Sequence, residues 1–252
     1  MEISRQQHFA ICHRDGPMLV LAGPGSGKTF TITQRIRHMI KEYHIPPEHI
    51  LVITFSKASA SEMQERFYEL MEHHFQPVSF GTFHAIFFQI LKNAYHYQNS
   101  DIISEKEKIQ YMTEIIQTYP EEILDENMVP HLLSDISRMK NEGTGVENYR
   151  VLYLPENLYA DIYRAYSKRL KQEGKIDFED MVLLCRDLLR ENSECLERWR
   201  QIYRYILIDE FQDINEAQFE VVKMLTGDRQ NLFAVGDDDQ AIYGFRGAKP
   251  EI

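Results

Sequence analysis

A glycine-rich segment near the start of the chain has the residue types and the spacing that bind phosphate groups. It lies between an apolar run, residues 18–21, and a helical pattern over residues 32–43. Glycines let main-chain N–H groups turn inward around an anion, and the start of the following helix adds its dipole. We expect Lys28 to reach the β- and γ-phosphates of a nucleotide and Thr29 to place its hydroxyl on Mg²⁺. The residues expected around the phosphates are Ala22, Gly23, Pro24, Gly25, Ser26, Gly27, Lys28 and Thr29.

Two acidic residues at the end of another apolar run complete the chemistry of such a site. Asp209 and Glu210 directly follow residues 205–208, and ligands of open α/β sheets bind at the carboxyl ends of the strands. We expect Asp209 to hold Mg²⁺ and Glu210 to orient or deprotonate an attacking water. Taken alone, each half has an ordinary alternative, a glycine-rich turn or a pair of solvent-facing acids. Together they favour a nucleotide-hydrolysing site in which Lys28, Asp209 and Glu210 are catalytic.

Short apolar runs must supply the strands that position these residues. The runs are apolar on both faces, and each is followed by a helix-like segment, which is typical of a parallel sheet covered on both sides. The expected strands cover residues 18–21, 50–55, 78–80, 205–208 and 232–235. The sequence therefore predicts an α/β fold in which helices cover the parallel sheet of a P-loop NTPase.

The strand pattern stops over residues 98–195, where the sequence is helical. The expected helices cover residues 105–118, 121–139, 156–171 and 178–190, and prolines and a glycine-containing turn punctuate the block. Helices that interrupt an α/β pattern indicate an inserted all-helical subdomain. We therefore expect a discontinuous nucleotide-binding domain, residues 1–97 and 196–252, and a helical insert, residues 98–195.

The formal net charge of −11 argues against a nucleic-acid partner, because phosphate contacts normally leave a basic footprint. Most of the excess acid lies between residues 98 and 198, however, and a narrow groove can be positive in an acidic protein. The net charge therefore does not exclude a nucleic-acid partner. No apolar run reaches the roughly 18 residues that span a bilayer, and the polar start does not look like a signal peptide. A soluble cytoplasmic protein without a membrane partner is expected.

Further segments accompany the phosphate loop and the acid pair in a fixed order. They cover residues 3–10, 54–60, 81–84, 175–180, 209–213 and 236–248. Together these segments resemble the UvrD/Rep family of superfamily 1 helicases from Gln7 to Ala248, which is nearly the whole chain. The resemblance implies a RecA-like motor domain that uses ATP to move along single-stranded DNA, usually 3′ to 5′, and separates the duplex ahead of it.

The resemblance also implies roles for individual residues. Gln7 looks like the residue that reads adenine, and Phe30 stands where better-known members carry an arginine that stacks on adenine. The residues implied in the single-strand track are Phe55, Ser56, Lys57, Thr82, His84, Tyr243 and Phe245. Aromatic rings there could stack on bases, and polar side chains could contact phosphate oxygens. Core packing is the alternative for each ring, and a solvated side chain is the alternative for Lys57, where the family usually has asparagine.

The resemblance also implies a group of residues that couple ATP hydrolysis to DNA binding. Gln240 would be a catalytic sensor of the γ-phosphate, and Arg246 would connect it to the acids of residues 209–213. The implied coupling residues are Gln212, Asp213, Asp237 and Arg246. Because the loop with Gln240 also carries Tyr243 and Phe245, the nucleotide state could alter the grip on DNA.

In the family, a second motor domain supplies arginines that neutralise charge on the transferred phosphoryl group, and no residue up to Ile252 fills that role. We therefore expect the chain to bind ATP·Mg²⁺, to hydrolyse it very slowly and not to unwind DNA by itself. Single-stranded DNA and single/double-strand junctions are the expected partners of the complete machine.

There are three alternative functions to consider besides this interpretation. The motor arm of a helicase-nuclease repair complex uses the same segments. A nucleotide-binding switch without translocation predicts damage to Glu210, Gln240 or the rings of the track, and all of these are present. A nucleotide or small-molecule kinase is disfavoured, because two acids followed by Gln240 activate and sense water and no element for binding a phosphate acceptor is evident.

Overall fold

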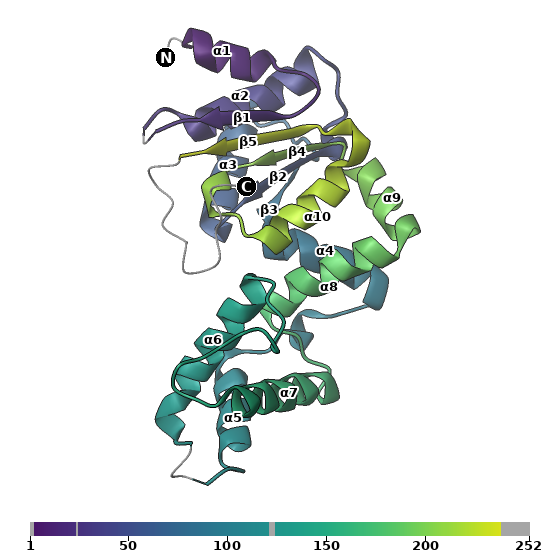
Figure 1. Cartoon of the computed structure of the whole chain (residues 1–252). Helices are drawn as coiled ribbons and strands as arrows, with labels where there is room; N and C mark the ends of the chain where they lie inside the picture. Colours follow the sequence, from purple (N-terminus) through teal and green to yellow (C-terminus); the bar gives the residue numbers. More distant parts are fainter. Residues whose placement is uncertain (1–2, 24, 121–123, 238–252) are drawn as a thin grey trace.

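Five parallel strands form one sheet in the computed structural model, which describes residues 3–23, 25–120 and 124–237 (Figure 1). The strands are β1 (Met18–Leu21), β2 (Ile50–Thr54), β3 (Ser79–Thr82), β4 (Tyr205–Ile208) and β5 (Leu232–Gly236). Their order is β1-β5-β4-β2-β3, and all four neighbouring pairs are parallel. The five predicted strands are therefore confirmed, with small shifts at the ends of β2, β3 and β5. The carboxyl ends of parallel strands lie at the same edge of the sheet. The loops that follow β1, β5 and β4 are therefore neighbours.

Helices cover both faces of the sheet, because alternate side chains of a strand point to opposite faces. Ile50 and Val52 of β2 pack in one apolar core, whereas Leu51 and Ile53 pack in another. The covering helices are α1 (Arg5–Cys12), α2 (Lys28–Lys41), α3 (Lys57–Leu70), α4 (Phe83–Tyr95), α8 (Phe178–Glu191), α9 (Ser193–Ile202) and α10 (Glu216–Thr226). The predicted α/β fold of a P-loop NTPase is confirmed. Within the described ranges, no helix combines the length and apolar character needed to cross a membrane.

Three more helices form a second unit with its own apolar core. This unit lies below the sheet in Figure 1. They are α5 (Glu105–Ile116), α6 (Val129–Asn141) and α7 (Glu156–Gln172). The buried side chains of this core begin at Ile103 and end at Leu170. Cys185 of α8 and Trp199 of α9 instead pack in the core of the sheet domain. Ile102 and Ile176 also pack in the core of the sheet domain, so we propose that the insert spans residues 103–175, a shorter segment than the predicted 98–195.

Helix α6 begins later than the sequence predicted. The prediction ran over residues 121–139, but residues 124 and 125 are not helical and the short 3-10 helix η3 (Glu126–Met128) precedes α6. Pro130 explains the difference, because proline lacks an N–H group and is tolerated only in the first turn of a helix. The prediction was therefore wrong over residues 124–128. The other short helices are η1 (Pro47–His49), η2 (Asn99–Asp101), η4 (Phe211–Asp213) and η5 (Gly227–Arg229).

A main-chain bridge and a buried ionic cluster join the two units. Ile102 and Ile176 form a parallel bridge where the chain enters and leaves the insert. Lys140, in the last turn of α6, places its Nζ 2.7 Å from Asp177 Oδ2 and 2.7 Å from Asp180 Oδ1. The side chains of Lys140 and Asp177 are each only 2% exposed. The insert is therefore fixed directly against the first turn of α8.

Candidate functional site

The loop between β1 and α2 has the backbone of a phosphate cradle. Gly25 and Gly27 have φ angles of 70° and 83°, a left-handed conformation that favours glycine. Gly27 is the N-cap of α2 and offers no side chain to cap the helix, so the first N–H groups of α2 face the loop without a side-chain acceptor. Lys28 and Thr29 are the first two residues of α2. This arrangement is the one that places main-chain donors and a lysine around an anion.

The two acids follow β4, two strands away from β1. The Asp209 N–H donates to the carbonyl of Ile53 at 3.0 Å, which extends the β4–β2 pairing to the first acid. Asp209 is buried, and burial together with the charge of Glu210 raises its pKa to about 6, although Lys28 acts in the opposite direction. Glu210 has a φ of 53°, which turns the chain sharply at the end of the strand. A buried acid at this edge is well placed to hold a cation.

The structure brings the two halves of the predicted site into contact. Lys28 Nζ lies 2.7 Å from Glu210 Oε2. The same oxygen accepts a hydrogen bond from Gln212 Nε2 at 2.8 Å, and Gln212 Oε1 accepts one from the N–H of Asp237 at 3.0 Å. A Cβ at Gly236 would lie 3.0 Å from Gln212 Oε1, so glycine at the end of β5 allows this approach. A continuous set of contacts thus runs from the phosphate loop through the β4 loop to β5.

Helix α1 reaches the phosphate loop through Gln7. The Gln7 Nε2 group donates to the carbonyl of Ser26 at 3.0 Å, while Gln7 Oε1 accepts from the N–H of Ser4 at 3.0 Å and closes a capping box. A Cβ at Gly27 would lie 3.2 Å from Gln7 Nε2, tighter than most Cβ contacts. Glycine at this position therefore serves both the turn and the close approach of α1.

A pocket of about 380 Å³ opens between the sheet domain and the insert, at the same edge of the sheet as the acids. Its lining residues are Phe55, Phe83, His84, Ser137, Asn141, Phe178, Glu179, Asp213, Asn215 and Gln218. Phe55 contacts Phe83 edge to face at 5.6 Å between ring centroids, and His84 contacts Phe178 in the same way at 5.4 Å. Asp213 joins this pocket to the acid loop, since only three residues separate it from Asp209.

The remaining polar residues expected in the track lie at helix starts beside this pocket. Ser56 is the N-cap of α3 and accepts from the N–H of Ser59, and Thr82 is the N-cap of α4 and accepts from the N–H of Ala85. Lys57 is the exposed first residue of α3. Helix starts are favourable places for phosphate oxygens, so these positions are compatible with contacts to a nucleic-acid backbone.

The remaining predicted residues flank the phosphate loop or lie outside the described part of the chain. Phe30 and Ala22 flank the phosphate loop and are partly buried. Pro24, Gln240, Tyr243, Phe245 and Arg246 lie outside the described residues. Among the residues described, no three His, Cys, Asp or Glu side chains gather as a metal site. A loop-bound Mg²⁺ needs only one or two protein oxygens beside those of the phosphates, which Thr29 and Asp209 could supply.

Two groups of residues near these sites were not predicted from the sequence. Phe178, Asn141 and Asn215 line the pocket between the units, and Asn215 Nδ2 donates to Asn141 Oδ1 at 3.2 Å. Arg35, buried in the middle of α2, donates to main-chain carbonyls at the end of α1. The acidic-aromatic segment at residues 175–180 was the one signal that pointed to Phe178.

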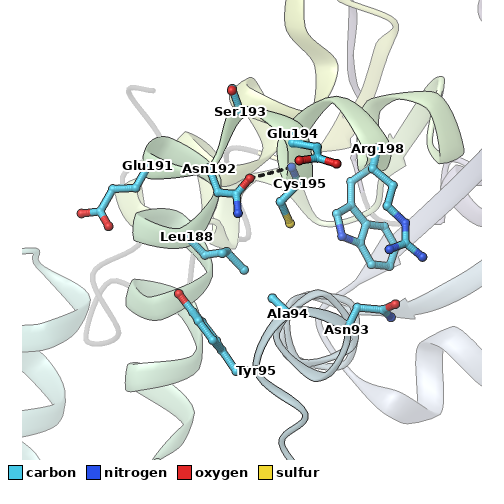
Figure 2. A pocket seen from close by; sticks show the side chains of 11 residues that line it. Asn93, Ala94, Tyr95, Leu188, Glu191, Asn192, Ser193, Glu194, Cys195 and Arg198 are labelled. Carbon is cyan, nitrogen blue, oxygen red and sulfur yellow. Dashed lines mark hydrogen bonds between the residues drawn. The ribbon is translucent and has the colours of Figure 1, made fainter.

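A second pocket, of about 630 Å³, lies away from these residues (Figure 2). It sits between the C-terminal ends of α4 and α8 and the start of α9, where Asn192 Oδ1 accepts from the N–H of Cys195 at 2.9 Å. Helix α4 starts at the carboxyl edge of the sheet, so its far end lies toward the opposite edge. None of the predicted site residues lines this pocket.

Comparison with known proteins places the arrangement in a family. The profile of the UvrD/REP helicase N-terminal domain matches residues 3–252. The chain is 38% identical to the putative ATP-dependent DNA helicase YjcD of Bacillus subtilis, over 99% of this chain and 34% of that protein. It is 34% identical to the ATP-dependent DNA helicase Rep of Escherichia coli, over 100% of this chain and 38% of Rep.

A third relative is the ATP-dependent DNA helicase PcrA of Leuconostoc citreum, which is 34% identical over 98% of this chain and 34% of PcrA. The chain thus spans a little over a third of the length of the curated relatives that it matches. The matched residues include the phosphate loop and the acid pair after β4. The chain belongs to the UvrD/REP helicase N-terminal domain family.

Proposed function

We propose that the chain binds ATP with Mg²⁺ between the β1–α2 loop and the acids after β4. The observation that carries this proposal is the 2.7 Å contact of Lys28 Nζ with Glu210 Oε2, which joins the two halves across the sheet edge. Lys28 would bind the β- and γ-phosphates, and the Thr29 hydroxyl and the Asp209 carboxylate would hold the cation. The bound cation supplies charge neutralisation on the phosphates.

Glu210 would act as the base that orients or deprotonates the attacking water. Its Oε2 is already placed by two donors, Lys28 Nζ and Gln212 Nε2. A phosphate that takes over Lys28 would leave Gln212 as the group that orients Glu210. The position of the base would then depend on the loop that leads to Asp213.

We further propose that this site drives movement of single-stranded DNA across the pocket between the units. The acid loop is the connection, since it carries Glu210 at one end and Asp213, a lining residue of the pocket, at the other. Phe55 and His84 would meet the bases, and Ser56, Lys57 and Thr82 the phosphate backbone. Gln212 and Asp237 would pass the nucleotide state from one site to the other.

The relatives are named ATP-dependent DNA helicases, and the complete protein is proposed to share that activity, acting at single/double-strand junctions in the cytoplasm. The helicase-nuclease alternative stays open, because it uses the same motor residues.

Coupling between the two sites is tested by the affinity for labelled oligo(dT), measured by fluorescence anisotropy with and without Mg²⁺ and a non-hydrolysable ATP analogue. Linked sites typically shift each other's affinity by about 5- to 150-fold, and we expect a shift in this range. Gln212→Met should bind both ligands and lose the shift, because it removes the amide that hydrogen-bonds both the Glu210 carboxylate and the main chain of Asp237. Gln172→Met, at an exposed position of α7, is the control. An oligo(dT) affinity that is insensitive to nucleotide in the unmodified chain would refute the coupling.

A further inference from the structure

Arg35 is a buried arginine in the middle of α2, the helix that follows the phosphate loop. It is 2% exposed, and its Cζ lies 4.4 Å from the centroid of the Phe233 ring. Within the described part of the chain, no carboxylate forms an ion pair with its guanidinium. Its partners are main-chain carbonyls: Nη1 donates to Ala10 at 3.2 Å and also to His13, and Nη2 donates to Arg14 at 3.4 Å.

The three carbonyls belong to the end of helix α1 and the residues just after it. The last carbonyls of a helix have no partner within the helix and carry the negative end of its dipole. Burial lowers the pKa of Arg35 to about 10, although the nearby Tyr43, Tyr205 and Asp15 oppose the shift. An apolar side chain of similar length would fill this space without that cost. What only the guanidinium supplies is a fixed set of donors for the end of α1.

The other end of α1 carries Gln7, which contacts the phosphate loop. Gln7 uses one amide hydrogen for the carbonyl of Ser26 and one lone pair for the N–H of Ser4. One hydrogen and one lone pair of the amide remain, which match the adjacent donor and acceptor on an edge of adenine. Guanine presents a different order of donors and acceptors, so an amide held in place distinguishes the two bases.

We propose that Arg35 is a positioning residue for base recognition: by holding the end of α1 against α2, it keeps Gln7 at the distance from the phosphate loop at which its amide selects adenine. This inference rests on the proposed nucleotide site. The contact between α1 and α2 is extensive, and α1 has only eight residues, so a shift at its C-terminal end moves Gln7 as well.

A second restraint acts on the same end of α1. Tyr43 lies two residues after the end of α2, and its hydroxyl donates to the carbonyl of Cys12 at 2.5 Å. Tyr43 is only partly buried. Its removal is therefore a milder perturbation of α1 than the removal of the Arg35 charge.

The test compares three ligands of the chain, each with Mg²⁺: a non-hydrolysable ATP analogue, the matching GTP analogue and tripolyphosphate, with dissociation constants measured by calorimetry. In Arg35→Met, the preference for the adenine nucleotide should fall about tenfold, the size of one or two lost hydrogen bonds. The affinity for tripolyphosphate should stay within about twofold, because the loop and Lys28 are unchanged. Arg35→Lys, which keeps the charge and donors, should restore part of the preference. Arg37→Met, at an exposed position of the same helix, is the control.

The proposal is overturned if Arg35→Met retains the full preference, if it loses affinity equally for all three ligands, or if the unmodified chain does not prefer adenine. Should Arg35→Met fail to fold, Tyr43→Phe is the deciding variant. A partial loss of the preference for the adenine nucleotide, with unchanged affinity for tripolyphosphate, supports the proposal. An unchanged preference for the adenine nucleotide contradicts it. An unmodified chain that binds none of the three ligands would refute the proposed function instead.

Discussion

Replacing Lys140 by methionine is expected to lower the free energy of unfolding by about 3–5 kcal/mol, the usual cost of removing one partner from a buried ionic group. Lys140 Nζ lies 2.7 Å from a carboxylate oxygen of both Asp177 and Asp180. Asp177 is as deeply buried as the lysine, whereas the Asp180 side chain is 26% exposed. Methionine fills a similar volume, so the cost arises mainly from two carboxylates left close together without a cation.

The pH dependence separates this explanation from a loss of packing. Burial opposes the charge on Lys140, but the two carboxylates outweigh burial and raise its pKa. Burial also opposes ionisation of Asp177, yet Lys140 lowers the pKa of that group, while burial and Asp177 raise the pKa of Asp180 to about 6. Without Lys140, the pKa of Asp177 also rises above that of the unfolded chain, and the pKa of Asp180 rises further. Stability of the variant should then increase as the pH falls from 7 to 5, by about 1.4 kcal/mol per pH unit for each group that binds a proton only in the folded state.

Urea unfolding followed by far-ultraviolet circular dichroism at pH 5, 6 and 7 measures both effects. The deficit of Lys140→Met relative to the unmodified chain should be largest at pH 7 and shrink toward pH 5. Lys168→Met, at an exposed position of α7, should change stability by less than about 0.5 kcal/mol at every pH. A deficit in Lys140→Met that is below about 1 kcal/mol, or that does not depend on pH, would contradict the role assigned to the ionic cluster.

Two further predictions concern the proposed ligands. Asp209, whose pKa is raised to about 6 by burial and by Glu210, must lose its proton to hold a cation; the Mg²⁺-dependent part of the nucleotide affinity should fall about tenfold per pH unit below that value, and Asp209→Asn should abolish this pH dependence in calorimetric titrations. Phe55→Ala should weaken oligo(dT) binding by about 5- to 150-fold if the ring stacks on a base, whereas Phe75→Ala, a residue 76% exposed and outside the pocket, should leave the anisotropy titration unchanged.

The strands and the phosphate loop could be predicted because their signals are local. Each strand is a short apolar run, and the loop has glycines where the backbone needs a left-handed conformation, as Gly25 and Gly27 show. Helix α6 starts later than predicted because a helix can begin at Pro130 but cannot pass through it.

Contacts between distant parts of the chain could not be predicted in the same way. The sequence placed Lys28 and Glu210 in one site, because both belong to recognisable motifs, but it did not predict their direct contact, which depends on the order of the strands. Lys140 and Arg35 carry no local signal, since a charged residue in a helix is usually solvated. Their burial follows from helix packing, which brings α6 against α8 and α2 against α1.

The most direct test of the proposed site is calorimetric titration of the chain with a non-hydrolysable ATP analogue, with and without Mg²⁺. We predict binding of one nucleotide that depends on Mg²⁺ and that weakens by at least about tenfold in Lys28→Ala, since that change removes charged hydrogen bonds to the phosphates. Lys41→Ala, exposed at the far end of α2, should bind as the unmodified chain does. Nucleotide uptake that is absent, that ignores Mg²⁺, or that is equally strong in Lys28→Ala would contradict the site formed by Lys28, Asp209 and Glu210.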